Sequence, residues 1–77
     1  MTRDEIEALL TFAGTYDSRE VGEAMVTAWL AAAVHAQWTN DEAIDAVIAH
    51  YAANNDWIRP GHITQTIRGS RRRFWQE

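Results

Sequence analysis

Arginines near the end of the chain are the residues best suited to binding chemistry. They recur at intervals that place several of them on one side of a helix. A guanidinium can form two parallel hydrogen bonds with one phosphate or carboxylate, and tryptophan beside arginine is typical of protein interfaces. We interpret the group as a basic ridge; the alternative is a solvated helix end whose cations complement the helix dipole. The predicted binding residues are Arg59, Arg68, Arg71, Arg72, Arg73 and Trp75.

Histidines are the other candidates for site chemistry. His35, His50 and His62 do not occur in pairs with metal-ligand spacing, and the chain has no cysteine to complete a tetrahedral set. We therefore predict no metal site and no cofactor. His50 is expected to be half-buried at the end of its helix, and His62 to lie in the first turn of the next one.

No nucleophile and base occur in a recognisable arrangement. Ser18 and Ser70 lie in no nucleophile elbow. Glu5, Glu20 and Glu42 fall where helix capping explains them. The sequence predicts no catalytic residue, so we expect the protein not to be an enzyme.

Charge is distributed unevenly along the chain. Residues 1–58 carry two arginines and ten acids, a net charge of −8, whereas residues 59–77 carry five arginines and one acid, a net charge of +4. The acidic majority argues against tight nonspecific DNA binding. A protein partner with an acidic patch is therefore as plausible as single- or double-stranded DNA.

The first two helices position the predicted core. A helix is predicted over residues 3–13, where Thr2 and Glu5 form a capping box and Gly14 ends the helix in the left-handed conformation. A second helix is predicted over residues 22–36, with Gly22 as its N-cap or with an earlier start near Asp17. The inward face of the second helix holds Met25, Trp29, Ala32, Ala33 and Ala36, with Trp29 as the centre of the core.

The third helix is predicted over residues 40–53, capped by Thr39 and Glu42. Asn54 is expected to end it in the left-handed conformation. We expect Trp38, just before the helix, to lie at its edge, where its exposure would favour a weak dimer. The apolar stripe of this helix consists of Ile44, Val47, Ile48 and Tyr51.

The fourth helix is predicted over residues 60–75. Pro60 suits its first position, and the residue before a proline favours extended geometry, so residues 57–59 should form an extended connector. We expect burial of Trp57 under this connector and exposure of Trp75. Ile63 and Ile67 should face inward, and Gly69 weakens the helix.

These elements predict an all-α fold, a compact bundle of four short helices that forms one domain over residues 1–77. The apolar runs are too short to span a bilayer, and the N-terminus lacks a signal-peptide pattern. We expect a cytoplasmic protein, in the host cell cytoplasm if phage-encoded, without membrane contact and either monomeric or weakly dimeric.

The order of several motifs resembles a known class of proteins. The motifs are Tyr16-Asp17-x-Arg19, Ala28-Trp29, Ala46-Val47-x-x-His50-Tyr51, Ile58-x-Pro60-Gly61-His62-Ile63 and Arg68-x-x-Arg71. Over residues 6–73 the chain resembles small helical proteins of actinobacterial phages and prophages. It resembles more distantly the N-terminal domain of phage replicative-helicase loader or inhibitor proteins.

The resemblance implies a non-catalytic DNA-replication accessory protein, an adaptor that binds a replicative helicase or an initiator. Helicase loaders of this type place their helicase contacts in a flexible C-terminal tail, and here the sequence ends at Glu77. The resemblance therefore assigns those contacts to residues 68–75, or else implies a different role. The alternatives are a small DNA-binding or regulatory protein that uses the arginine ridge, and a phage inhibitor of a host protein.

Overall fold

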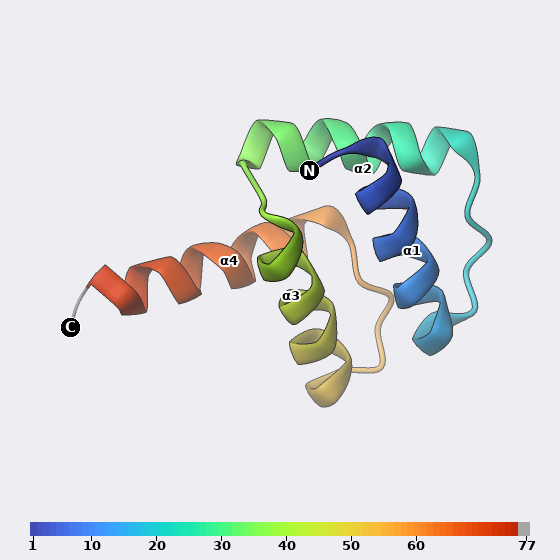
Figure 1. Cartoon of the computed structure of the whole chain (residues 1–77). Coiled ribbons are helices and arrows are strands. Elements are labelled where there is room, and N and C mark those ends of the chain that lie inside the picture. Colours follow the sequence, from blue (N-terminus) through green and yellow to red (C-terminus); the bar gives the residue numbers. More distant parts are fainter. Residues whose placement is uncertain (76–77) are drawn as a thin grey trace.

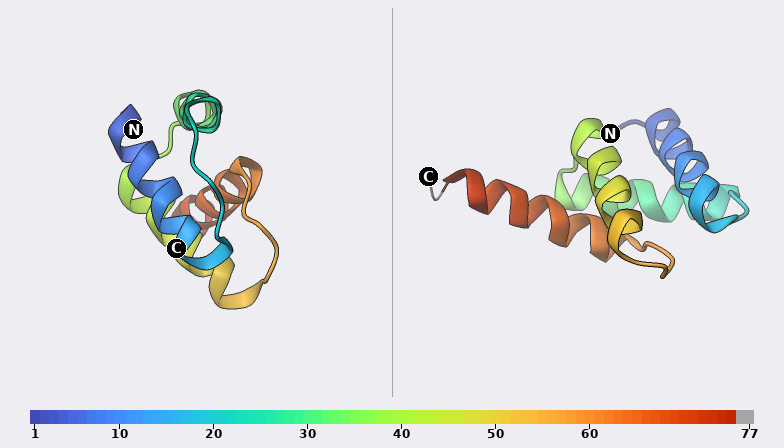
Figure 2. Two further views of the ribbon diagram at one scale, coloured as in Figure 1. Left: turned by 90° about the vertical axis from the view of Figure 1, so that its right-hand side faces the viewer. Right: turned by 90° about the horizontal axis from the view of Figure 1, so that it is seen from below.

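Four helices form two layers of two. The structure, a computed structural model, describes the backbone of residues 1–75 and the side chains of residues 1–72. The helices are α1 (Arg3–Asp17), α2 (Glu23–Ala36), α3 (Asn40–Ala53) and α4 (Pro60–Trp75). In this part of the chain α1 packs on α2 and α3, and α4 packs on α3 and α2. Helices α1 and α3 thus form one layer and α2 and α4 the other (Figures 1 and 2). The all-α single-domain prediction is confirmed.

The helix starts follow the predicted capping chemistry. The Thr2 hydroxyl accepts a hydrogen bond from the Glu5 backbone at 3.2 Å, and the Thr2 backbone donates to the Glu5 carboxylate at 2.8 Å. Gly22 is the N-cap of α2. Thr39 caps α3, but its hydroxyl also donates to the Glu42 side chain, so only half of the predicted reciprocal box forms.

The predicted end of α1 was wrong, whereas α2, α3 and α4 end at Ala36, Ala53 and Trp75 as predicted. Helix α1 does not stop at Gly14; it continues to Asp17, and Ser18 takes the left-handed conformation with φ 59°. The extra turn forms because Asp17 has partners in two other segments, described below. Asn54 is extended rather than left-handed, and both its backbone and side-chain nitrogens donate to the carbonyl of His50.

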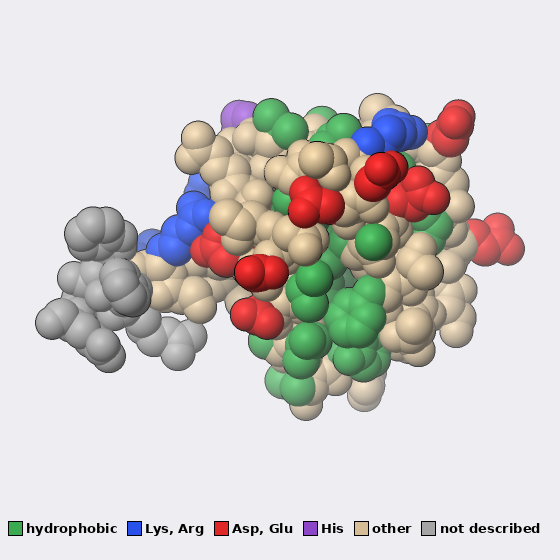
Figure 3. Space-filling view, in the orientation of Figure 1, with side chains coloured by type: hydrophobic (Ala, Val, Ile, Leu, Met, Phe, Trp, Pro, Cys, Tyr) green, Lys and Arg blue, Asp and Glu red, His purple; other side chains and the backbone are tan. Residues whose placement is uncertain are grey.

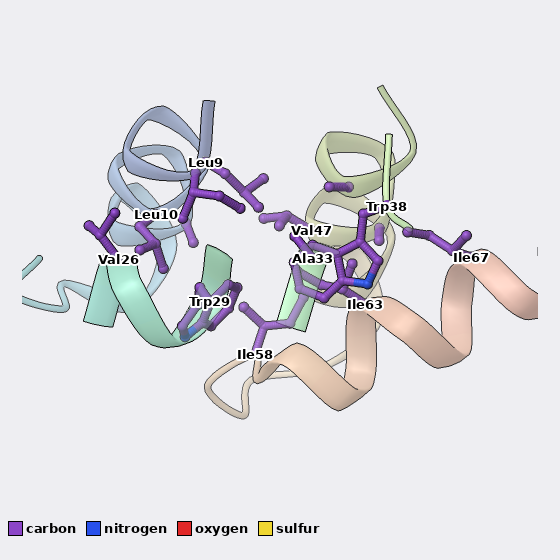
Figure 4. Packing of buried hydrophobic residues seen from close by; sticks show 14 residues of the cluster. Leu9, Leu10, Val26, Trp29, Ala33, Trp38, Val47, Ile58, Ile63 and Ile67 are labelled. Carbon is purple, nitrogen blue, oxygen red and sulfur yellow. The ribbon is translucent and has the colours of Figure 1, made fainter. Parts of the chain in front are cut away.

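The core lies between the two layers, where buried side chains from all four helices and the connector meet (Figure 4). Trp29 is buried as predicted, and its ring meets that of Trp38 edge to face with centroids 6.3 Å apart. Trp38 is only 3% exposed, so it does not offer the exposed surface that would favour a weak dimer. It is buried because the left-handed Gln37 turns the chain inward, where the Trp38 indole donates to the hydroxyl of Thr64 at 3.0 Å.

The connector before α4 is extended as predicted, but the prediction that Trp57 is buried was wrong. Successive residues of an extended segment point to opposite sides. Ile58 is 1% exposed and fills the core, which leaves Trp57 facing solvent at 54% exposure. Ile63 and Ile67 of α4 face inward as predicted, whereas Ile48 of α3 is exposed instead of buried. No helix within residues 1–75 combines the length and apolar character needed to span a bilayer.

Candidate functional site

The predicted basic ridge is divided by the structure. Arg71 lies four residues after Ile67, so it continues the inward stripe of α4 and turns back to the body. Its guanidinium binds the Glu42 carboxylate through two hydrogen bonds of 2.7 and 2.9 Å and the Gln37 carbonyl at 3.0 Å. Hydrogen bonding to Arg71 is the main cause of a lowered Glu42 pKa. Arg71 therefore anchors α4 to the start of α3 and the end of α2.

Other predicted ridge residues lie apart from Arg71. Arg68 and Arg72 are exposed one turn apart on α4, so they form a pair on one ridge. Arg59 is exposed in the connector, nine residues before Arg68, which corresponds to roughly 13 Å of helix rise. Arg73 and Trp75 belong to α4, but their side chains lie outside the described residues. Among the predicted residues whose side chains the structure describes, only Arg68 and Arg72 form an exposed pair.

A polar cluster at the other end of the bundle uses many of the motif residues. Arg19 and Asp17 form an ion pair of 2.6 Å, with their side chains 3% and 2% exposed. Arg19 also donates to the carbonyl of Ile58 at 2.9 Å. The Tyr51 hydroxyl donates to Asp17 and accepts from the backbone nitrogen of Ile58 at 2.8 Å. One cluster thus joins α1, α3, the α1–α2 linker and the connector.

Aromatic rings cover the guanidinium of Arg19 on two sides. Its central carbon lies 5.3 Å from the ring centroid of Trp29 and 5.2 Å from that of Trp57. These are cation–π distances. Burial favours the neutral form of Arg19, but the hydrogen bond to Asp17 outweighs it, and the pKa of Arg19 is raised. A permanently charged arginine paired in this way is a structural tie between segments.

The two neighbouring histidines also have structural partners. His50 and His62 stack with ring centroids 4.8 Å apart. The Nε2 of His50 lies 2.7 Å from the Asp56 carbonyl, to which it donates. Nδ1 of His62 accepts from the backbone of Arg59 at 2.9 Å, which caps the start of α4. The predicted positions of both histidines are confirmed, and no group of metal-ligating side chains forms among the described residues.

The layer formed by α1 and α3 has a hollow on its surface that was not predicted from the sequence. We call it the α1/α3 groove, a hollow of about 450 Å³ between these two helices. Most of its exposed lining is apolar. Figure 3 shows hydrophobic side chains gathered on this face, with acidic side chains above them and to their left. The lining residues are Asp4, Glu5, Ala8, Leu9, Phe12, Asn40 and Ile44.

The apolar strip continues along both helices beyond the groove. Tyr16 follows Phe12 by one turn and is 49% exposed, and Ile48 follows Ile44 by one turn and is 45% exposed. The Phe12 and Tyr16 rings pack edge to face, and Tyr16 stacks on Tyr51 at 4.9 Å. Tyr51 is held by the polar cluster, so this end of the strip is fixed in place before any ligand arrives.

Acidic side chains border the groove. Asp4 and Glu5 line it, Glu7 is exposed one turn from Asp4 on α1, and Asp41 is exposed on α3 next to Asn40. No lysine or arginine is among the described residues that line it. The groove therefore offers apolar contact with negative charge along part of its border.

Sequence reasoning missed the groove because it assigned the whole stripe of α3 to the core. The sequence did contain an indication of an uncovered apolar surface. Phe12 lies outside the predicted stripe of α1, and Ile48 lies on the edge of the α3 stripe that is nearest the acidic residues. Comparison with protein-family models, curated proteins and solved structures finds no match to this chain.

Proposed function

We propose that this protein is a non-catalytic adaptor that binds a basic, apolar helix of a partner protein in the α1/α3 groove. One observation carries the proposal: an apolar strip with an acidic border remains uncovered between two packed helices. Exposed apolar strips bordered by polar residues are typical of interaction sites. Binding of an amphipathic helix in a groove is a common mode of recognition.

The shape and chemistry of the groove favour a helix as ligand. Phe12 of α1 and Ile44 of α3 both line the hollow and offer contact for large apolar side chains. The acids Asp4 and Asp41 lie where arginines or lysines flanking those side chains could pair with them. Such complementary charge speeds association and selects the partner.

The non-catalytic part of the proposal rests on the occupation of the polar groups. Asp17 and Glu42 are each paired with an arginine, and both carboxyl pKa values are lowered. A general base or acid needs a pKa near the working pH, and these two carboxyls are shifted away from it. Their partners hold segments of the fold together instead.

The resemblance named above makes a replicative helicase, or the initiator that recruits it, the first partner to test. The measurement is a titration of the full chain with the replicative helicase of the host or phage, followed by calorimetry. The Ile44→Lys variant, which places a charge in the groove, should weaken binding at least about tenfold. Val34→Lys is the matched control, because Val34 is an exposed apolar residue of α2, 63% exposed and outside the groove.

Helicase binding that is equally weakened by both variants would place the contact elsewhere. Absence of binding at about 100 µM, a concentration that detects affinities well below those of typical complexes, would exclude the helicase as partner.

A further inference from the structure

We infer that the α1/α3 groove also receives the C-terminal end of α4 from a second copy of this chain, so that copies associate head to tail. We call residues 68–75 the basic arm. The inference deepens the proposed function and rests on it for the groove being a helix-binding site.

Charge complementarity supports this occupant. Two acids line the groove, Asp4 and Glu5, and the exposed acids Glu7 and Asp41 lie next to lining residues of α1 and α3. The basic arm contains four arginines and no acid, and one of these arginines, Arg71, is paired with Glu42 of its own chain. Seating the arm of one copy in the groove of another would bring opposite charges together. Contact between the two bodies without the arm would instead bring together residues 1–58, which carry a net charge of −8 on each copy.

The arm also has the apolar side chains that a groove ligand needs. Its sequence ends in Phe74 and Trp75, next to Arg72 and Arg73. Aromatic residues beside arginine dominate the energetics of protein interfaces. The groove between Phe12 and Ile44 is lined mainly by apolar atoms, so it matches such a segment in chemistry.

The fold directs the arm away from the groove of its own chain. Arg71 ties α4 to Glu42 and Gln37, and the helix continues without a break to Trp75. Figures 1 and 2 show the end of α4 leaving the body, and the molecule is elongated at 40 × 26 × 16 Å. A continuous helix cannot bend back, so the arm can reach only the groove of another molecule.

Groove and arm are different surfaces, and this fixes the symmetry of the association. A contact between two different surfaces is head to tail, and it forms open chains unless the rotation closes a ring. Because the contact involves one groove and one helix end, we expect it to bury less than the roughly 1,200 Å² of standard interfaces. We therefore expect weak, salt-sensitive association in the range of about 10 µM to 1 mM.

The test uses the full chain in analytical ultracentrifugation. The groove variant is Asp4→Arg/Asp41→Arg and the arm variant is Arg68→Glu/Arg72→Glu; all four positions are exposed, which limits damage to the fold. The average mass of the wild type should rise with concentration beyond that of a dimer. Each variant alone should associate at least about tenfold more weakly. Val34→Lys should behave as the wild type.

Mixing the chains distinguishes a contact between groove and arm from a contact between two like surfaces. A chain that carries both sets of substitutions should regain association, because the reversed arm again meets a groove of opposite charge. Ile44→Lys, which keeps an intact arm, mixed with the arm variant, which keeps an intact groove, should form a dimer that neither forms alone. A mixture that stays monomeric, or a wild type that is monomeric at about 1 mM, overturns the inference.

Self-association and helicase binding can succeed or fail independently in these experiments. A monomeric wild type whose helicase binding is lost with Ile44→Lys overturns self-association and leaves the adaptor proposal standing. Head-to-tail association without helicase binding supports the inference and removes the helicase as partner. Association that both groove variants leave unchanged places the interface elsewhere and overturns the inference.

Discussion

The guanidinium of Arg19 lies 2.6 Å from the carboxylate of Asp17, and both side chains are almost completely withdrawn from solvent. Around this pair the Tyr51 hydroxyl and the Ile58 backbone complete a hydrogen-bonded cluster. Asp17, Arg19, Tyr51 and Ile58 all belong to the motifs of the family resemblance, and each has a structural role in this cluster. These motif residues therefore hold the segments of the fold together, while the exposed groove lies on the neighbouring face.

Replacing Arg19 by lysine should destabilise the fold although it keeps the charge. Lysine cannot form the planar fork that reaches both Asp17 and the Ile58 carbonyl. Leaving buried hydrogen-bond partners unsatisfied costs about 1–3 kcal/mol. Urea unfolding of Arg19→Lys measures the loss, and Arg72→Lys at an exposed position should change stability by less than about 0.5 kcal/mol. Equal effects of the two substitutions would refute the assigned role of Arg19.

Stability should fall in acid because of Asp17. Burial raises the pKa of its carboxyl, but hydrogen bonds from Arg19 and Tyr51 outweigh burial and leave the pKa below the ordinary value of 3.8. A depressed folded-state pKa contributes stability that is present above the unfolded-state pKa and is lost as pH falls through the folded-state value. The loss should therefore begin near pH 4. Glu42, whose pKa is lowered chiefly by Arg71, adds to it in the same direction.

Urea unfolding at a series of pH values from about 6 to about 2.5 tests this dependence. Asp17→Asn should be less stable than the wild type at neutral pH and should lose less on acidification. A variant with the same pH profile as the wild type would contradict the effect of Asp17.

The tryptophans that flank Arg19 should differ in their contribution to stability. Trp29→Ala removes a buried ring and should cost about 3–5 kcal/mol, enough to unfold a domain of this size. Trp57→Ala removes a half-exposed ring whose main contact is cation–π, worth about 0.5–1 kcal/mol. Thermal melts followed by far-ultraviolet circular dichroism compare them. A cooperatively folded Trp29→Ala variant would show that the core is centred elsewhere.

Gly69→Ala should stabilise the protein. Gly69 lies inside α4, and a methyl group added there meets no atom within 4 Å. Alanine is favoured over glycine in a helix interior by about 1 kcal/mol. The urea midpoint should rise. A fall would mean that α4 is not a continuous helix at this point.

Local signals in the sequence predicted much of the fold. Capping residues located the starts of α1 and α3, and Pro60 located the start of α4. The end of α1 was predicted wrongly, since its last turn depends on contacts of Asp17 with Arg19 and Tyr51, which belong to other segments. Contacts between segments also decide the burial of Trp38, which depends on the left-handed turn at Gln37 and on Thr64.

The binding surface was harder to predict than the helices. Spacing placed Arg71 with the other arginines, but its partner Glu42 lies 29 residues away and takes it out of the ridge. Ile48 matched the inward stripe of α3, yet it is exposed. The residues of α3 that are buried against the other helices are Ala43, Ala46 and Val47. A helical period identifies an apolar face, and only the arrangement of the layers decides how much of it is covered.

The groove is tested most directly by nuclear magnetic resonance of the full chain labelled with ¹⁵N, recorded from about 10 µM to about 1 mM. The groove proposal predicts that the amide signals of Ala8, Phe12, Asn40 and Ile44 shift with concentration together with those of the basic arm, while the signal of Val34 on α2 does not shift. Added salt should reverse these shifts. Shifts centred on α2, or none at the highest concentration, would contradict it.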